Sequence, residues 1–257
     1  MLAEPQTTSA DLEFDLAGIR VRVSAWFWLA AALLGWNVCQ AFSGGDQRML
    51  LQMLVIWIGV VLLSILAHEM GHALAYRGFG QSAHVVLYHF GGLAVPDSWG
   101  RRHLRPMERL LVSAAGPLAQ LLLAGLVIAG LRASGYAVPF PITGIALFDD
   151  AGARGFSSPL VYALFDFLLY VNIFWPLLNL IPVPPLDGGQ IVREGLLVLG
   201  VSEAHRIAGI IGVAAGAFVA WWGYTHGQPF LGIMFAMLAA SCFQGLSAGN
   251  TPWRRWN

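Results

Sequence analysis

Two histidines and a glutamate at the end of a long apolar stretch are the residues in this chain best suited to catalysis. His68, Glu69 and His72 form the pattern H-E-x-x-H, which is typical of zinc-dependent proteases. Residues four apart lie on one face of a helix, so both imidazoles can reach a single zinc ion. Glu69 can then act as a general base toward a water molecule. The pattern predicts a hydrolytic zinc centre with His68 and His72 as ligands and Glu69 as the catalytic residue.

The stretch that leads into this pattern is apolar enough to cross a bilayer. Residues 49–67 contain no charged side chain. Ionisable groups buried at membrane depth are costly, so His68, Glu69 and His72 need a functional reason to be there. The sequence therefore predicts a zinc site inside a membrane.

The composition supports a membrane protein. The 257 residues are 57% hydrophobic and 11% charged, and the mean hydropathy is +0.66. A soluble domain would have about a quarter charged residues. The net charge is zero, which gives no basic surface for nucleic acid. Cys39 and Cys242 form no C-x-x-C pattern, so a cysteine-based zinc site is not indicated.

Six apolar segments are long enough to span a membrane, and two shorter ones favour β-structure. We expect a polytopic α-helical membrane protein with about six transmembrane helices and a small membrane-associated β-sheet near the cytoplasmic face. We expect residues 1–257 to form a single membrane-embedded domain, with residues 1–13 as a flexible tail and 250–257 as a cytoplasmic tail. The expected spans are 24–42, 49–76, 107–131, 160–181, 205–224 and 229–246, and the expected β-segments are 14–23 and 84–95.

The distribution of arginine predicts the orientation. With the N-terminus in the cytoplasm, eleven of the fourteen basic residues fall on the inner side, and Arg48, Arg132 and Arg154 fall outside. This is a positive-inside bias, and it predicts that both termini are cytoplasmic. We expect an integral, multi-pass protein of a bacterial inner membrane.

A third metal ligand must come from another part of the chain, because a catalytic zinc of this kind takes three protein ligands and a water. Residues 179–189 hold three prolines, which interrupt a helix, and the carboxylate of Asp187. Asp166 is the rival carboxylate. Nine residues separate His68 from Arg77, which places His68 about 13 Å from the inner edge, and Asp187 lies at a similar depth. Asp166 is about 24 Å further along its helix, so depth favours Asp187.

Four segments of the chain resemble the site-2 protease family of intramembrane zinc metalloproteases. The H-E-x-x-H pattern matches the first family motif, and residues 179–189 match the second, N-x-x-P-x-x-P-L-D-G-G, in full. Residues 113–120 match the family's A-G-P segment, with Gln120 where the family often has Asn. Residues 90–92 match its membrane-dipping strand, with His89 where the family often has Pro. The similarity runs from about residue 14 to residue 195.

The resemblance implies further roles around the metal. It implies one Zn²⁺, and a role for Asn179 near the scissile carbonyl, where it would help to hold the substrate or the oxyanion. Gly91 and Gly92 are candidates for the same region, although a glycine pair in a strand more often serves backbone geometry. Many family members carry a PDZ or CBS domain. This chain has no room for one, so we expect any regulator to be a separate protein.

The expected function is therefore that of an intramembrane zinc endopeptidase. Its substrate would be a single-span membrane protein, cut in or near its transmembrane segment during regulated intramembrane proteolysis. Two alternative functions are a zinc transporter and an inactive scaffold. A zinc transporter would need polar residues on several spans, and only the second and fourth are so equipped. An inactive scaffold that binds membrane segments would not need an intact set of catalytic positions, and this chain keeps all of them.

Overall fold

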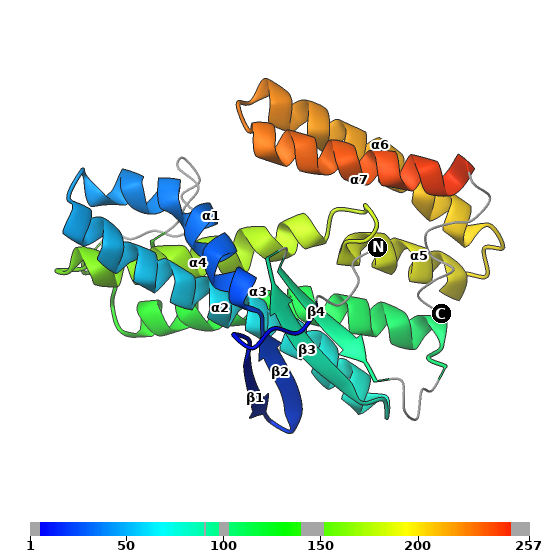
Figure 1. Ribbon diagram of the computed structural model, residues 1–257, viewed down its shortest axis with the longest axis horizontal. Helices are drawn as coiled ribbons and strands as arrows, with labels where there is room; N and C mark the ends of the chain where they lie inside the picture. Colours follow the sequence, from blue (N-terminus) through cyan, green and yellow to red (C-terminus); the bar gives the residue numbers. More distant parts are fainter. Residues whose placement is uncertain (1–5, 90, 98–102, 140–151, 248–257) are drawn as a thin grey trace. The chain divides into compact units, whose positions relative to one another are not determined.

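The computed structural model describes residues 6–89, 91–97, 103–139 and 152–247, and it confirms the expected fold class (Figure 1). Six described helices are long and apolar enough to cross a membrane. Their ends lie within two residues of the predicted ends. The six helices are α1 Ala25–Ser43, α2 Gln47–Gly78, α3 Pro106–Ala133, α4 Pro159–Asn179, α6 Ala204–Thr225 and α7 Pro229–Ser247.

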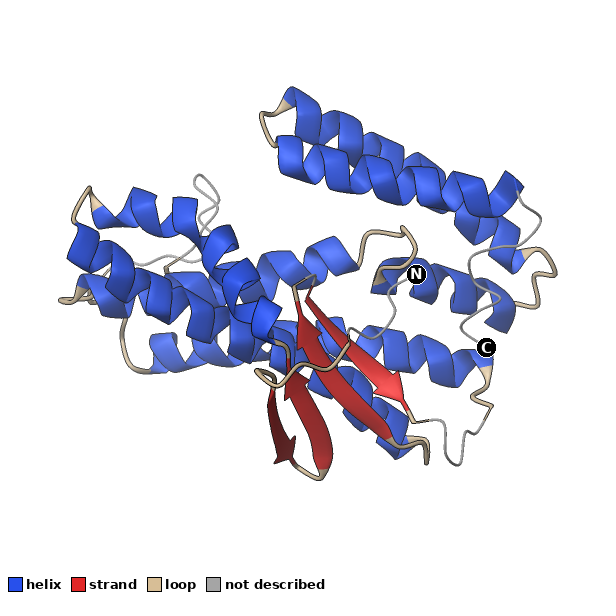
Figure 2. Ribbon diagram, in the orientation of Figure 1, coloured by secondary structure: helices blue, strands red, loops and turns tan. Residues whose placement is uncertain are grey.

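Four short strands form one sheet, drawn in red in Figure 2. The strands are β1 Leu12–Leu16, β2 Ile19–Val23, β3 Ala83–Tyr88 and β4 Gly91–Pro96, and they lie in the order β1-β2-β3-β4. Both predicted β-segments are confirmed, and each forms an antiparallel hairpin. The sequence did not predict the parallel pairing of β2 with β3, which joins the hairpins into one sheet.

The chain divides into two compact units. Among the described residues, the sheet unit contains 6–89, 91–97, 118–139 and 152–176, and the helical unit contains 103–117 and 177–247. The chain passes from one unit to the other directly after Pro117 in α3 and directly after Pro176 in α4. A proline inside a helix removes one backbone hydrogen bond, so both changes of unit occur at weakened points of a helix. The extent of the domain and of its two tails stays a prediction.

The core of the sheet unit depends on close packing between α1 and α2. The indole of Trp57 lies against Gly35, where an added Cβ would be 2.2 Å from the ring. The indole N–H donates a hydrogen bond to the carbonyl of Ala31 at 3.0 Å. The ring of Phe167 from α4 meets Trp57 edge-on, with 5.2 Å between the centroids. A bulky aromatic residue therefore fills the space that a glycine leaves.

Asp11 ties the first hairpin to the start of α1. Its carboxylate accepts hydrogen bonds from the Arg22 guanidinium at 3.0 Å and from the backbone N–H of Ala25 at 3.2 Å. The Thr8 hydroxyl also donates to it, and this bond is the largest cause that lowers the pKa of Asp11 to about 2. Asp11 therefore stays charged throughout the physiological pH range.

The helical unit contains an additional helix, α5 Asp187–Val198, which the sequence did not predict. Residues 180–186 are not helical, as the three prolines predicted, and a new helix begins at Asp187. Arg109 from the start of α3 donates to the buried carboxylate of Glu194 at 2.8 and 2.9 Å, and Arg193 pairs with the same carboxylate. These ion pairs compensate the charges of Arg193 and Glu194 in α5. The same two charges are the reason that the sequence of α5 did not resemble a membrane span.

Replacing Gly35 with alanine should destabilise the protein, because the new methyl group must displace Trp57. Overpacking of this kind costs about 1–3 kcal/mol. Gly59→Ala on α2 is the matched control, since a Cβ there would meet nothing within 4 Å. We expect thermal unfolding in detergent, followed by circular dichroism, to show a lower midpoint for Gly35→Ala and no loss for Gly59→Ala. Equal midpoints for the two variants would contradict the packing account.

Candidate metal centre

The two histidines of the H-E-x-x-H pattern converge on one point. They lie on α2, with 3% of His68 and 8% of His72 exposed. Their Nε2 atoms are 3.1 Å apart, and their rings are nearly perpendicular. Two nitrogens held by one tetrahedral zinc at about 2.0–2.1 Å would be about 3.3 Å apart. The pair therefore fits a zinc ion with little adjustment of either side chain.

A buried amide forms a hydrogen bond with Nδ1 of His68, the ring nitrogen that faces away from His72 Nε2 in the pair. Nδ1 of His68 lies 2.9 Å from Oε1 of Gln120, which projects from α3 and is fully buried. No role was predicted for Gln120 beyond its place in the A-G-P segment. The feature that could have indicated a role is a polar amide within an apolar membrane-spanning helix, where burying a polar group is energetically unfavourable.

A second buried amide bonds to α2 one turn before His68. Asn172 on α4 donates to the Ser64 hydroxyl at 2.8 Å and to the carbonyl of Leu168 at 2.9 Å. Both Ser64 and Asn172 are fully buried. This contact was also missed, because nothing in the sequence shows which helices are neighbours. It means that α3 and α4 each contribute one amide to the polar face of α2.

The carboxylate of Glu69 lies directly against strand β4. Only 6% of Glu69 is exposed, and a Cβ added at Gly92 would meet its side chain at 2.3 Å. Strand β4 can approach the Glu69 side chain this closely only because Gly92 has no side chain. This agrees with the expectation that the glycine pair serves backbone geometry. Burial, followed by the charge of Glu69, raises the pKa of Tyr88 on β3 to about 12. Tyr88 therefore remains a neutral phenol beside this carboxylate.

Gly91 has a different reason to be glycine. Its φ of +123° is a backbone conformation that other residues rarely adopt. A Cβ at this position would also come within 3.2 Å of the ring of Trp175. Phe90, which belongs to the same sequence match, lies outside the described residues. The glycine pair therefore shapes the start of β4, with Gly92 facing Glu69 and Gly91 beside Trp175.

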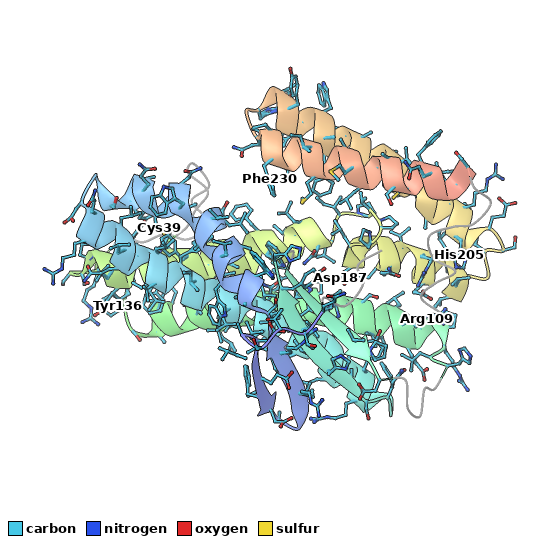
Figure 3. The ribbon with its side chains drawn as sticks, viewed as in Figure 1. Cys39, Arg109, Tyr136, Asp187, His205 and Phe230 are labelled. Carbon is cyan, nitrogen blue, oxygen red and sulfur yellow. The ribbon has the colours of Figure 1, made fainter. Side chains whose placement is uncertain are left out.

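Asp187 is the first residue of α5, as Figure 3 shows. The N-terminus of a helix favours a carboxylate, because unpaired backbone N–H groups and the helix dipole point toward it. A Cβ on Gly188 would lie 2.1 Å from the carbonyl oxygen of Leu180, and one on Gly189 would lie 2.5 Å from the nitrogen of Pro184. The two glycines let the first turn of α5 pack against the segment that precedes it.

His68 and His72, two of the three ligands that the sequence predicted, lie in the sheet unit, and Asp187, the third, begins α5 in the helical unit. Asp166, the rival carboxylate, lies within α4 with 7% exposed. The choice of Asp187 as the third ligand stays a prediction. Asn179 is the last residue of α4 and is partly buried, so it stands at the start of the segment that leads to Asp187.

Comparisons with known proteins agree on one family. The model of peptidase family M50 matches residues 56–220. Rip3 of Mycobacterium tuberculosis, whose name describes it as a zinc metalloprotease, is 30% identical over 215 residues, which cover 78% of this chain and 49% of Rip3. A Synechocystis protein with a similar name is 30% identical over 136 residues, which cover 52% of this chain and 30% of that protein. The chain thus spans half or less of these relatives.

A solved structure shares the fold. The site-2 protease from Methanocaldococcus jannaschii superposes with a TM-score of 0.51 at 20% sequence identity, over 91% of this chain and 94% of that one. The match agrees with the combination of long apolar helices and a small sheet that the described residues form.

Gly92→Ala should disable hydrolysis at this centre while leaving metal binding intact. The added methyl group would push the Glu69 side chain aside, and misplacing a reacting group by about 1 Å can cost about 10²-fold in rate. His68 and His72 would keep their positions, because Gly92 contacts Glu69. Metal content by mass spectrometry and cleavage of a membrane-embedded peptide are the measurements. Gly78→Ala is the control, since a Cβ there meets nothing, and a Gly92→Ala rate equal to its rate would contradict this role.

Proposed function

Because the chain belongs to peptidase family M50, we propose that it is an intramembrane zinc endopeptidase that hydrolyses a peptide bond in or near the transmembrane segment of a membrane-protein substrate. The observation that carries the proposal is the His68–His72 pair. It is buried in a helix able to span a membrane, with its Nε2 atoms 3.1 Å apart and Glu69 adjacent in the chain. Two convergent imidazoles with a neighbouring carboxylate support metal-assisted hydrolysis.

We place the zinc on His68, His72 and Asp187. Each of the three offers one ligand atom, and two imidazoles with one carboxylate form a ligand set that zinc takes in hydrolases. Zinc bound there would polarise the scissile carbonyl and lower the pKa of a water molecule. The carboxylate of Asp187 contributes one negative charge, which compensates part of the ion's charge in a surrounding of low dielectric constant.

Glu69 is the proposed general base. It accepts a proton from the attacking water and delivers it to the amine of the leaving peptide. Its position against Gly92 supports this role, because β4 limits where the carboxylate can move. A carboxylate held in one place needs less reorganisation before each proton transfer.

The exposed edge of β4 is the proposed docking edge for the substrate. In the sheet order β4 comes last, and among the described strands it pairs with β3 alone. An extended peptide can add to such an edge through backbone hydrogen bonds. Since Gly92 of this strand contacts Glu69, a peptide paired with β4 would run past the general base. The substrate helix must unwind first, because helical hydrogen bonds occupy its peptide groups.

Asn179 is the proposed contact to the scissile carbonyl or its oxyanion. An amide N–H is a suitable donor for a developing negative charge. Gly91 and Gly92 are proposed to keep the backbone of β4 open to the substrate in the same region. The positive φ of Gly91 and the close contact of Gly92 support a shaping role for both.

We also propose a cellular setting. The protein is an integral, multi-pass membrane protein, and we place it in a bacterial inner membrane with both termini in the cytoplasm, which the arginine distribution supports. The substrate would be a single-span membrane protein, and cleavage would be a step of regulated intramembrane proteolysis. We propose the lipid bilayer and a separate regulatory protein as its further partners.

Two substitutions separate metal binding from chemistry. Glu69→Gln should keep zinc, because Glu69 is not a proposed ligand, and should lower hydrolysis by about 10²–10⁴-fold. His72→Ala should lose both zinc and hydrolysis. The measurements are zinc content and fragment formation from a co-expressed single-span protein. If purified Glu69→Gln cleaved at the wild-type rate, the general-base role would be wrong.

The depth of the site predicts where substrates are cut. In the proposed orientation, the nine residues from His68 to Arg77 place His68 about 13 Å from the inner edge, so cleavage should fall in the cytoplasmic third of the substrate span. Gly, Pro, Asn or Ser near the scissile bond should speed cleavage because they weaken a helix, and Leu or Ala should slow it. A substrate series that differs only at those positions, with cut sites mapped by mass spectrometry, is the test. Equal rates across the series, or cuts in the outer half, would count against selection by unwinding.

A further inference from the structure

We propose that Gln120 is a positioning residue that fixes the tautomer of His68, so that Nε2 of His68 carries the lone pair offered to the metal. The inference rests on the proposed function, because it concerns the same zinc centre. It adds a residue of α3 to a site whose proposed ligands lie on α2 and α5.

The contact between the two side chains is specific and fully enclosed. Oε1 of Gln120 lies 2.9 Å from Nδ1 of His68, and the two residues are 52 positions apart in the chain. Gln120 is fully buried, and only 3% of His68 is exposed. Val112, Gln120 and Ala124 are buried at a spacing of one or two helical turns on α3. The amide therefore occupies an interior position where its neighbours on the same face are apolar.

The chemistry of an amide oxygen decides the tautomer. Such an oxygen accepts hydrogen bonds and donates none, so Nδ1 of His68 must carry the hydrogen. The neutral ring then has its lone pair on Nε2, the atom that lies 3.1 Å from Nε2 of His72. An amide turned the other way would donate to Nδ1 and leave the hydrogen on Nε2, so that the hydrogen would have to leave Nε2 and the amide contact would break before that atom could bind zinc.

The amide nitrogen of Gln120 also supports a role at His68. Within the described chain, Nε2 of Gln120 is buried without a hydrogen-bond partner. An unpaired buried donor is unfavourable, so the bond from His68 to Oε1 is the hydrogen bond of this amide that favours its burial. Metal-bound histidines commonly donate their second N–H to an oxygen, which orients the ring and raises its basicity. Gln120 provides that oxygen.

Asn172 supplies an internal comparison for a purely structural amide. It is as buried as Gln120 and bonds to the same helix, but its partner is Ser64, one turn before His68. Loss of either amide removes a hydrogen bond between helices and should lower stability to a similar extent. Only loss of the Gln120 bond should change the presentation of His68 to a metal.

The test measures zinc affinity of the purified full chain in detergent, by competition with a chromophoric chelator. Gln120→Met, which is close in size and cannot accept a strong hydrogen bond, should weaken zinc binding by about 10–100-fold. Gln120→Glu keeps an acceptor oxygen and should restore most of the affinity. Asn172→Leu should unfold at a lower temperature and bind zinc as tightly as the wild type.

Several results would overturn the inference. One is wild-type zinc affinity in folded Gln120→Met, and another is an equal loss in Asn172→Leu, because affinity would then follow helix packing alone. If wild-type protein bound no zinc, or if His72→Ala bound it equally well, the proposed metal centre itself would fail, and the inference with it. If the wild-type protein bound zinc and Gln120→Met bound it equally tightly, only the role of Gln120 would be refuted.

A measurement without any substitution gives an independent answer. In metal-free wild-type protein, the nitrogen chemical shifts of histidine report which ring nitrogen carries the hydrogen. We expect His68 to be protonated on Nδ1 and His72 to donate from Nε2 across the 3.1 Å contact. A neutral His68 with its hydrogen on Nε2 would overturn the proposal even if the Gln120 variants did not fold.

Discussion

The cost of placing polar groups inside an apolar helix bundle is the constraint on which the rest of this structure depends. Helix α2 is long and apolar, yet it buries Ser64, His68, Glu69 and His72 on the way to its C-terminal end. Each of these groups would destabilise the fold if it were left without compensation. The neighbouring elements are arranged to provide it: Asn172 bonds to Ser64, Gln120 bonds to His68, and the imidazoles of His68 and His72 meet each other.

The small sheet has a related function, because it brings backbone to a carboxylate. Strand β4 can pass close to Glu69 only because Gly92 has no side chain, and the strand can begin as it does only because Gly91 tolerates a positive φ. Non-helical backbone near membrane depth is tolerated where protein covers it. The parallel pairing of β2 with β3 provides one side of that cover, since the buried faces of both strands contribute to the core.

Helix α5 illustrates how a charged segment can be part of a membrane protein without being a span. Glu194 is fully buried, but Arg109 and Arg193 both contact its carboxylate. Removing one partner of such a network would leave a buried charge, so the network holds α5 against the start of α3. That attachment also fixes Asp187, which is seven residues earlier on the same helix, and hence on the same side after two turns. In the proposed enzyme, the third ligand is thus supported by charges well away from the metal.

The sequence by itself determined the features that depend on local pattern. Residues 49–67 and the five other apolar runs predicted the helices to within two residues, because length and hydropathy decide whether a helix can span a bilayer. Alternation around Gly18 and the glycine pair Gly91–Gly92 predicted the two β-segments, and the spacing of His68 and His72 predicted that they share a helix face. These are properties of neighbouring residues and need no knowledge of the rest of the chain.

Only the tertiary structure decided which distant residues meet. Gln120 finds His68 across 52 positions, Asn172 finds Ser64 across 108, and Gly92 contacts Glu69 from another element. Neither helical periodicity nor hydropathy shows which helices are neighbours or how each is rotated about its axis. Helix α5 was missed for the same reason, because its charges are acceptable only once Arg109 is in place. Contacts of this kind arise from packing, and packing depends on the whole chain at once.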